Sequence, residues 1–177
     1  MKGIIYIIPF NKVDLNIIRK LALQLERKFG YKVKIGKEMN IPSSAFNPKR
    51  NQYLSPVLLS KLKQKIPRDA MKILGVIDVD LYVPQLNFVF GQAELGGKVA
   101  LISITRLRQE YYGLKPNQKL FELRILKEAT HELGHCFGLN HCPNPRCVMH
   151  FSNSLQDTDY KSHEFCANCK KILERLK

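Results

Sequence analysis

The segment HELGHCFGLNH, residues 131–141, contains three histidines and a glutamate. On a helix, His131 and His135 project from the same face one turn apart, so both imidazoles can reach a single zinc ion. Gly138 permits a sharp turn after the helix, which would bring His141 in as the third ligand. A histidine pair at this spacing also occurs on ordinary helices, but the five fixed positions of H-E-x-x-H-x-x-G-x-x-H make the metal interpretation strong. Three protein ligands leave the fourth position to water, as in a catalytic zinc site.

Glu132 lies beside the first histidine of this motif. Its side chain is rotated by about 100° around the helix, away from the ligand face but close to the expected water. Zinc lowers the pKa of a bound water and polarises a carbonyl group. A carboxylate in this position can take the proton of the water and pass it to a leaving amine. The motif therefore predicts peptide-bond hydrolysis by a zinc-activated water, with Glu132 as general base and acid.

Four cysteines near the C-terminus predict a second zinc ion. Cys142, Cys147, Cys166 and Cys169 follow the pattern C-x₄-C-x₁₈-C-x₂-C. In a reducing compartment this spacing favours a closed structural site over disulfides. The ion would hold together a tail that has few apolar residues, and it would fix Cys142 directly beside His141. We interpret the fifth cysteine, Cys136, as a small buried residue rather than a nucleophile.

The rest of the sequence predicts the elements that must position these sites. After Pro116, apolar residues recur every three or four positions up to Phe137, so we expect one long helix that ends near Gly138. Two further helices are expected before it, with Asp14 and Gly30 as the ends of the first, and a short one is expected at the C-terminus. Their approximate bounds are 14–29, 55–66 and 167–176. Strands are predicted at residues 3–9, 31–35, 72–78, 87–90 and 98–105, and the last two are expected to pair antiparallel.

This order predicts an α+β fold whose N-terminal part is α/β-like. Residues 1–139 would form a sheet-and-helix subdomain that ends in the active-site helix, and residues 36–54 within it read as a loop. Residues 140–177 would form a small, irregular, zinc-stapled subdomain. At 177 residues, the two are expected to make one compact catalytic domain.

The histidine motif, followed by Met149 in CVMHF, resembles the metzincin zinc peptidases and their Met-turn. The resemblance implies a mixed five-stranded sheet with an antiparallel edge strand that borders the cleft and pairs with substrate. It also implies that Met149 lies under the zinc site as an apolar base. The implied edge strand comprises Asn87, Phe88, Val89, Phe90 and Gly91.

A cysteine directly after the last histidine, then CVM and FCANC, is similar to the archaemetzincins, as are NFVFGQA, SITRL and FSNSL. This likeness covers about residues 72–173. It implies a zinc metallopeptidase with an undefined substrate, aminopeptidase-like in some members. Some metzincins have a tyrosine two residues after the Met-turn methionine, where this chain has Phe151. Without that hydroxyl, either another group assists or the rate is modest.

The chain opens almost at once on its first expected strand, so we expect no pro-segment. An unprotected peptidase is safer with a restricted substrate, which favours short peptides or removal of N-terminal residues. An aminopeptidase needs an acidic anchor for the substrate amino group. Glu94, just after the expected edge strand, is the candidate, although an ordinary solvated glutamate would look the same.

Net charge is +14, and residues 1–70 hold 15 Lys or Arg against 4 Asp or Glu. Such a basic half can bind nucleic acid, but few aromatic residues are interleaved, so solvated helix faces are the favoured explanation. No apolar run approaches the roughly 20 residues of a membrane span. We therefore expect a cytoplasmic monomer that acts on peptides. The alternative is a weak or inactive metzincin-fold protein that binds peptide or nucleic acid.

Overall fold

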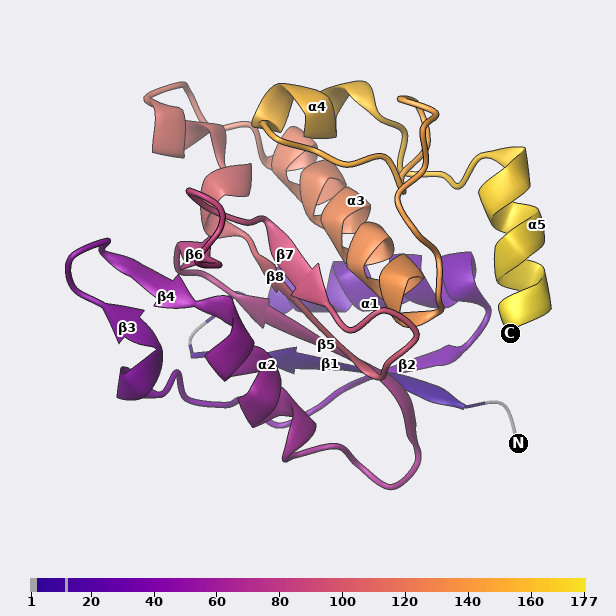
Figure 1. The fold of residues 1–177 in the computed structure, drawn as a ribbon, viewed down its shortest axis with the longest axis horizontal. Helices are drawn as coiled ribbons and strands as arrows, with labels where there is room; N and C mark the ends of the chain where they lie inside the picture. Colours follow the sequence, from indigo (N-terminus) through magenta and orange to yellow (C-terminus); the bar gives the residue numbers. More distant parts are fainter. Residues whose placement is uncertain (1–2, 12) are drawn as a thin grey trace.

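The computed structural model describes residues 3–11 and 13–177, and its centre is a five-stranded sheet (Figure 1). The strand order is β2-β1-β5-β8-β7. The first four strands run parallel, whereas β7 is antiparallel to β8. The bounds are β1 Ile4–Pro9, β2 Lys32–Ile35, β5 Ala70–Ile77, β7 Gly91–Ala93 and β8 Val99–Ser103. The expected mixed sheet with an antiparallel edge strand is confirmed.

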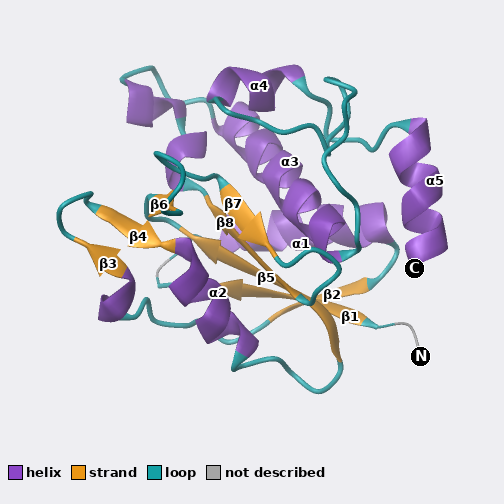
Figure 2. Ribbon diagram, in the orientation of Figure 1, coloured by secondary structure: helices purple, strands orange, loops and turns teal. Residues whose placement is uncertain are grey.

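Helices cover both faces of this sheet (Figure 2), which explains why its inner strands are apolar on both sides. Helices α1 (Leu15–Phe29) and α3 (Gln118–Cys136) pack on one face, and α2 (Ser55–Lys63) packs on the other. Alternate residues of β5 divide between the two cores: Leu74 and Val76 face α1 and α3, while Ile73 and Ile77 face α2. The result is a three-layer arrangement with the sheet in the middle.

The ends of the helices follow the expected capping residues. The Asp14 carboxylate accepts a hydrogen bond from the Asn16 amide, and Gly30 ends α1 in the left-handed region. The structure adds a cap that was not predicted: at the start of α3, the Asn117 side chain accepts from the Leu120 amide. Helix α3 stops at Cys136, and Gly138 follows with a φ of 100°. These local signals fix the length and direction of the motif helix.

The structure differs from the sequence-based expectation in two short regions. Residues 36–54, expected to be a loop, contain a 3-10 turn at Ser43–Ala45 and two strands, β3 (Phe46–Asn47) and β4 (Gln52–Leu54). With β6 (Leu81–Tyr82) they form a second, three-stranded sheet. Strands of two or three residues are too short to show a period. Two further 3-10 turns, at Thr105–Leu107 and Gln109–Tyr112, lead from β8 toward α3.

The C-terminal segment packs against the end of α3 rather than standing apart from it. It contains α4 (Leu155–Tyr160), which we did not expect, and the expected α5 (Ala167–Leu176). The signal for α4 is a capping box between Ser154 and Asp157. Val148, Met149 and Leu173 share one apolar cluster with α1 and α3. Within the described ranges, no helix is both long and apolar enough to cross a membrane.

Candidate metal centres and active-site cleft

Helix α3 and the turn after it bring the three motif histidines together. One ring nitrogen of each of His131, His135 and His141 lies within 4.8 Å of the others. The Nε2 atoms of His131 and His135 are 3.1 Å apart, close to the roughly 3.3 Å expected between two nitrogens bound to one tetrahedral zinc ion. Gly138 makes the turn, and its amide donates to the carbonyl of His135.

The hydrogen bonds of the other ring nitrogens show that this cluster suits a cation. His131 Nδ1 lies 2.8 Å from the Val148 carbonyl oxygen, and His135 Nδ1 lies 2.7 Å from that of Leu139. A carbonyl oxygen only accepts, so both Nδ1 atoms carry the proton. Burial lowers the pKa of His131 well below its usual value and also lowers that of His135, which favours neutral rings. The two unprotonated Nε2 atoms then point their lone pairs at each other, an arrangement that a metal ion bound between them would stabilise.

The side chain of Glu132 extends from α3 toward the edge strand β7. This side chain fills the space beside Gly91: a Cβ added to Gly91 would lie 2.7 Å from Glu132 Cγ and 2.8 Å from its Oε1. The pKa of Glu132 is raised to about 8, mainly by burial and also by the nearby Glu128 carboxylate, while the Lys161 ammonium opposes the shift. Glycine at position 91 is therefore what lets the strand approach the carboxylate.

Met149 lies directly under the motif helix and is fully buried. A Cβ added to Gly134 would come within 2.4 Å of Met149 Sδ. Gly134, one of the unspecified positions of the motif, thus provides the room for the methionine. The sequence interpretation of Met149 as an apolar base fits this contact, but it missed the matching glycine.

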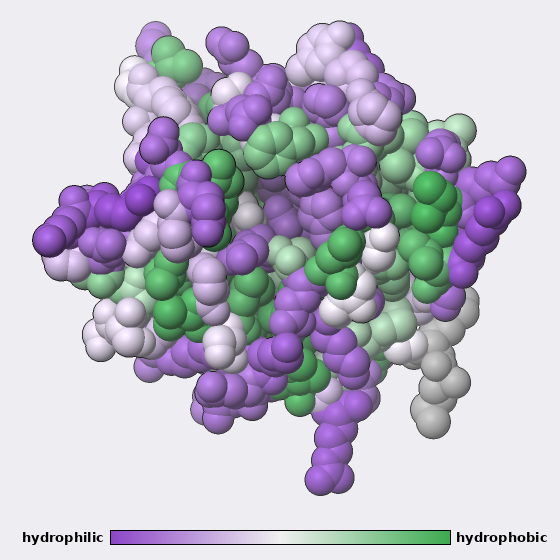
Figure 3. Space-filling model, viewed as in Figure 1, coloured by the Kyte–Doolittle hydropathy of each residue, from purple (hydrophilic) through white to green (hydrophobic). Residues whose placement is uncertain are grey.

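A cleft of about 410 Å³ opens between α3 and the segment that leads into β7, and Figure 3 shows the surface hollowed near the middle of this face. The three histidines and Glu132 line one side. The rest of the lining is formed by Val83, Leu86, Asn87, Phe88, Val89, Phe90, Gly91, Gln92, Ala93, Phe151, Ser152 and Asn153. Three of these residues, Phe88, Phe90 and Phe151, are aromatic.

The bounds predicted for the edge strand were wrong by several residues. Strand β7 is Gly91–Ala93, so only Gly91 belongs to both ranges. Asn87, Phe88, Val89 and Phe90 precede the strand and line the cleft, with one isolated bridge between Val89 and Leu81. The sequence of these four residues resembles that of a strand, but in the structure they form a loop that ends at β7.

Glu94 does not lie where an amino-group anchor would be needed. Its carboxylate is 2.8 Å from Lys63 Nζ, and it is absent from the cleft lining. Among described residues, the carboxylates that line the cleft are Glu128 and Glu132. These contacts do not support Glu94 as the anchor, because its carboxylate pairs with Lys63 of α2.

The four C-terminal cysteines also converge, and none forms a disulfide. The Sγ atoms of Cys142, Cys147, Cys166 and Cys169 all lie within 4.8 Å of one another. Cys142 and Cys166 are 3.8 Å apart, the separation of about 3.8 Å expected for two thiolates on a tetrahedral zinc ion. Burial raises the pKa of Cys166, but hydrogen bonds from the Cys169 backbone and from neighbouring thiols outweigh this effect and lower the pKa to about 7. The lowered pKa favours the thiolate, which is the form that binds metal.

Cys136 lies apart from this cluster in the apolar core. Its side chain is fully buried, and burial raises the pKa of the thiol to about 12. The Lys72 ammonium donates to the Cys136 carbonyl at 2.6 Å and so caps the end of α3. The interpretation of Cys136 as an inert buried residue fits these surroundings.

A buried ion pair that the sequence did not reveal joins α3 to the segment after α4. Lys161 Nζ lies 3.0 Å from Glu128 Oε1, and the two side chains are 0% and 3% exposed. Lys161 also donates to the His150 carbonyl, and the Thr158 hydroxyl donates to Glu128. The pair therefore connects the motif helix with the Met-turn segment.

Lys161→Met is expected to destabilise the protein by about 3–5 kcal/mol, because it leaves the Glu128 carboxylate buried and unpaired. Adding Glu128→Gln should recover most of that loss, since the amide can still accept from Thr158 without carrying a charge. Urea unfolding of the metal-loaded protein measures both. Lys20→Met is the matched control, because it breaks the exposed Lys20–Glu122 pair and should cost less than about 1 kcal/mol. Equal losses for Lys161→Met and Lys20→Met would contradict the expectation.

The HExxH helix beside an antiparallel edge strand, with the third histidine beyond a glycine turn, places the chain among the zinc metallopeptidases. The family model described as peptidase family M54 matches residues 12–175. The chain belongs to this family, the archaemetzincins. The archaemetzincin of Pyrococcus furiosus is 49% identical over 184 residues, which cover 99% of this chain and 95% of the relative.

Solved structures agree with this assignment. The crystal structure of an archaemetzincin from Methanopyrus kandleri has a TM-score of 0.87 at 37% identity, and the match covers 99% of this chain and 95% of that one. The crystal structure of a zinc-dependent peptidase from Methanocorpusculum labreanum has a TM-score of 0.85 at 33% identity, with 96% and 99% covered. The predicted family, fold class and enzyme class are confirmed.

Proposed function

We propose that this metallopeptidase hydrolyses short peptides at a zinc ion held by His131, His135 and His141, with Glu132 as general base and acid. The observation that carries the proposal is the pair of Nε2 atoms 3.1 Å apart, both unprotonated by the hydrogen-bonding argument above. A zinc ion bound there supplies a Lewis acid that polarises a carbonyl and lowers the pKa of water. The carbonyls of Val148 and Leu139 keep two of the imidazoles oriented toward the ion.

Glu132 is placed to move the proton. Contact with Gly91 fixes its side chain at the junction of α3 and β7, where it faces the cleft. We assign one Oε atom as acceptor of a proton from the attacking water, and the same group then donates it to the departing amine. Burial raises the pKa of Glu132, whereas a dication held by the neighbouring histidines would favour the carboxylate form that accepts the proton.

The free edge of β7 supports binding of an extended substrate. The Phe90 carbonyl and the Glu94 amide bond to β8, so by strand alternation the backbone groups of Gly91 and Ala93 point to the open edge. We assign these groups as partners of the substrate backbone. Phe88, Phe90 and Phe151 then favour an apolar side chain nearby. Because the Glu94 carboxylate points away from the cleft, it is not placed to bind the amino group of a substrate. This residue therefore gives no support to an aminopeptidase activity.

We further propose that Cys142, Cys147, Cys166 and Cys169 hold a second, structural zinc ion. The four sulfurs match a closed tetrahedral site, and the Cys166 amide donates to Cys147 Sγ at 3.3 Å, which stabilises a thiolate there. The Cys142 amide donates to the Met149 carbonyl, which ties this site to the Met-turn. Two ions of different role are therefore expected in each chain.

His135→Ala is expected to reduce bound zinc from about two ions per chain to about one, because only the cysteine site keeps a full ligand set. Hydrolysis of a mixed peptide library should be lost in the same variant. Elemental analysis of the purified protein gives the count. A wild-type stoichiometry near one that His135→Ala leaves unchanged would overturn the two-site proposal.

A further inference from the structure

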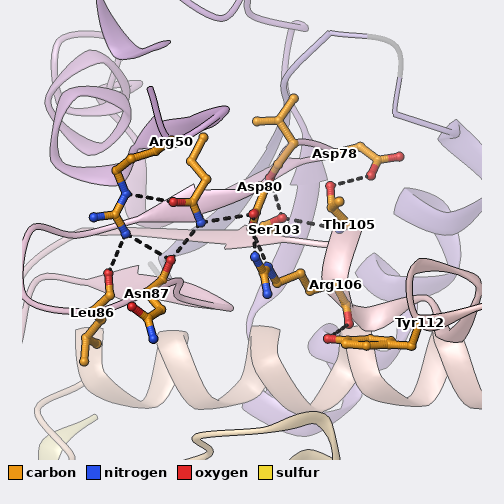
Figure 4. A network of polar contacts seen from close by, with 11 residues as sticks. Arg50, Asp78, Asp80, Leu86, Asn87, Ser103, Thr105, Arg106 and Tyr112 are labelled. Atoms are coloured by element: carbon orange, nitrogen blue, oxygen red, sulfur yellow. Dashed lines mark hydrogen bonds and ion pairs between the residues drawn. The ribbon is translucent and has the colours of Figure 1, made fainter. Parts of the chain in front are cut away.

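A polar network at the carboxyl ends of β5 and β8 remains unexplained by the proposed chemistry (Figure 4). Its centre is Asp80, which accepts from both Nε and Nη2 of Arg106 at 2.6 and 2.7 Å. Gln52 from β4 donates to the same carboxylate at 3.0 Å. The Arg106 and Asp80 side chains are 21% and 14% exposed, so water screens this bidentate pair only partly.

The network extends from Asp80 to the backbone of the cleft wall. Gln52 also donates to the Asn87 carbonyl at 2.8 Å. Arg50 donates to Gln52 Oε1, to the Leu86 carbonyl and to the Asn87 carbonyl, at 2.8, 2.8 and 3.1 Å. Two successive carbonyls of an exposed loop are thus held by side chains of β4 and of the turn before it.

Arg106 makes a second contact with this wall. Its guanidinium lies 4.2 Å from the centre of the Phe88 ring, and Phe88 packs edge-on against Phe90 at 5.1 Å. Both rings line the cleft that the three histidines also line. Leu86, Asn87 and Phe88 are otherwise exposed or only partly buried, so apolar packing alone does not hold the segment in place.

We propose that the Asp80–Arg106–Gln52–Arg50 network is the positioning device for the substrate-binding wall, residues 83–90, and thereby sets the affinity for peptide. This rests on the proposed function of the cleft. In the part of the chain that the structure describes, Arg106 and Asp80 form no hydrogen bond or ion pair with the proposed metal ligands or Glu132. They therefore act on binding through Phe88 and the loop carbonyls. Loosening the network should therefore weaken substrate binding and leave the chemical step nearly unchanged.

Arg108 provides a matched control. It forms an ion pair with Asp78 at 2.6 Å, and its guanidinium lies 4.5 Å from the Phe121 ring. It therefore shares with Arg106 both an aspartate partner and an aromatic partner. No recorded contact joins Arg108 to residues 83–90 in the described part of the chain. A general loss of stability would affect both variants, whereas positioning of the wall would affect Arg106 alone.

The test compares Arg106→Gln, Arg50→Gln and Arg108→Gln in the zinc-loaded protein. We expect KM for a peptide with an apolar side chain to rise about tenfold in Arg106→Gln and about threefold in Arg50→Gln, with kcat within about twofold. Arg50 is exposed, so its variant should fold even if Arg106→Gln does not. Arg108→Gln should change neither constant.

Hydrogen exchange provides a readout that does not depend on activity. The amides of Leu86 and Val89 donate to the carbonyls of Val83 and Leu81, and both should exchange at least about tenfold faster in Arg106→Gln but not in Arg108→Gln. Unchanged KM together with unchanged exchange in Arg106→Gln and Arg50→Gln would overturn the inference, as would equal effects of Arg108→Gln. If the wild type hydrolyses no peptide, the proposed function fails, and the exchange comparison still decides whether the network holds the wall.

Discussion

Glu132→Gln should lower kcat/KM for peptide hydrolysis by about 10²–10⁴-fold while both zinc ions stay bound. Glutamine has nearly the same shape as glutamate, so the contact with Gly91 and the approach of β7 should persist. Under the proposed mechanism, the variant loses the carboxylate that accepts a proton from water and later donates it to the amine. Steady-state kinetics on a peptide identified from the library, with a zinc count on the same sample, measure the effect.

Glu122→Gln is the control for this substitution. Glu122 belongs to the same helix, but its carboxylate lies at the surface paired with Lys20, far along α3 from the motif. Its replacement should leave kcat/KM within about twofold. Retention of most of the activity in Glu132→Gln would exclude Glu132 as the base. A wild type without turnover would favour a binding protein that keeps the fold of the peptidase.

The histidine cluster was largely predictable because its members are close in sequence. A helix of known pitch fixes His131 relative to His135, and a glycine with φ of 100° delivers the next histidine within six residues. The four cysteines carry similar information, since their spacing and chemistry allow few other arrangements. Local geometry decides both clusters, so a single sequence is enough to propose them.

The features that the sequence hid depend on pairs of residues far apart in the chain. Gly91 and Glu132 are separated by 41 positions, and their contact exists only because β7 lies beside α3. The same is true of Glu128 with Lys161 and of Asp80 with Arg106, which are ordinary charged residues when read singly. Periodicity and capping describe one element at a time, so they give no account of contacts between elements.

The uneven charge of the chain has a similar explanation. Lys20, Lys28 and Lys63 of the basic half pair with Glu122, Glu164 and Glu94 of the other half, at 2.7, 2.7 and 2.8 Å. Part of the basic excess in residues 1–70 is therefore matched in space by carboxylates from later elements. These pairs support the interpretation of the lysines as residues of helix faces rather than of a nucleic-acid surface.

Disruption of the cysteine cluster is expected to cause a large loss of stability in residues 140–177. Cys166→Ser combined with Cys169→Ser removes two of four ligands and should release one zinc ion per chain. Structural zinc in small domains contributes an apparent binding free energy of about 10–16 kcal/mol, which is also folding free energy. Residues 140–177 should then lose their fixed structure, because three of their six buried core residues, Cys142, Cys147 and Cys169, belong to the proposed metal site. Limited proteolysis should cut this segment in the variant and spare it in the wild type.

The same double substitution is expected to reduce peptide hydrolysis at least about tenfold, although all three histidines and Glu132 remain. His141 is bonded directly to Cys142, whose amide donates to the Met149 carbonyl and whose carbonyl lies 2.8 Å from His150 Nδ1. Loss of a metal ion from Cys142 would therefore free the third histidine and the Met-turn together. Cys136→Ala serves as the control: it removes a buried thiol outside both clusters and should cost only about 1 kcal/mol with both ions retained. A double variant that keeps two zinc ions, resists proteolysis and hydrolyses peptide normally would show that the cysteines are not a structural site, and would leave His141 to be held by the Gly138 turn alone.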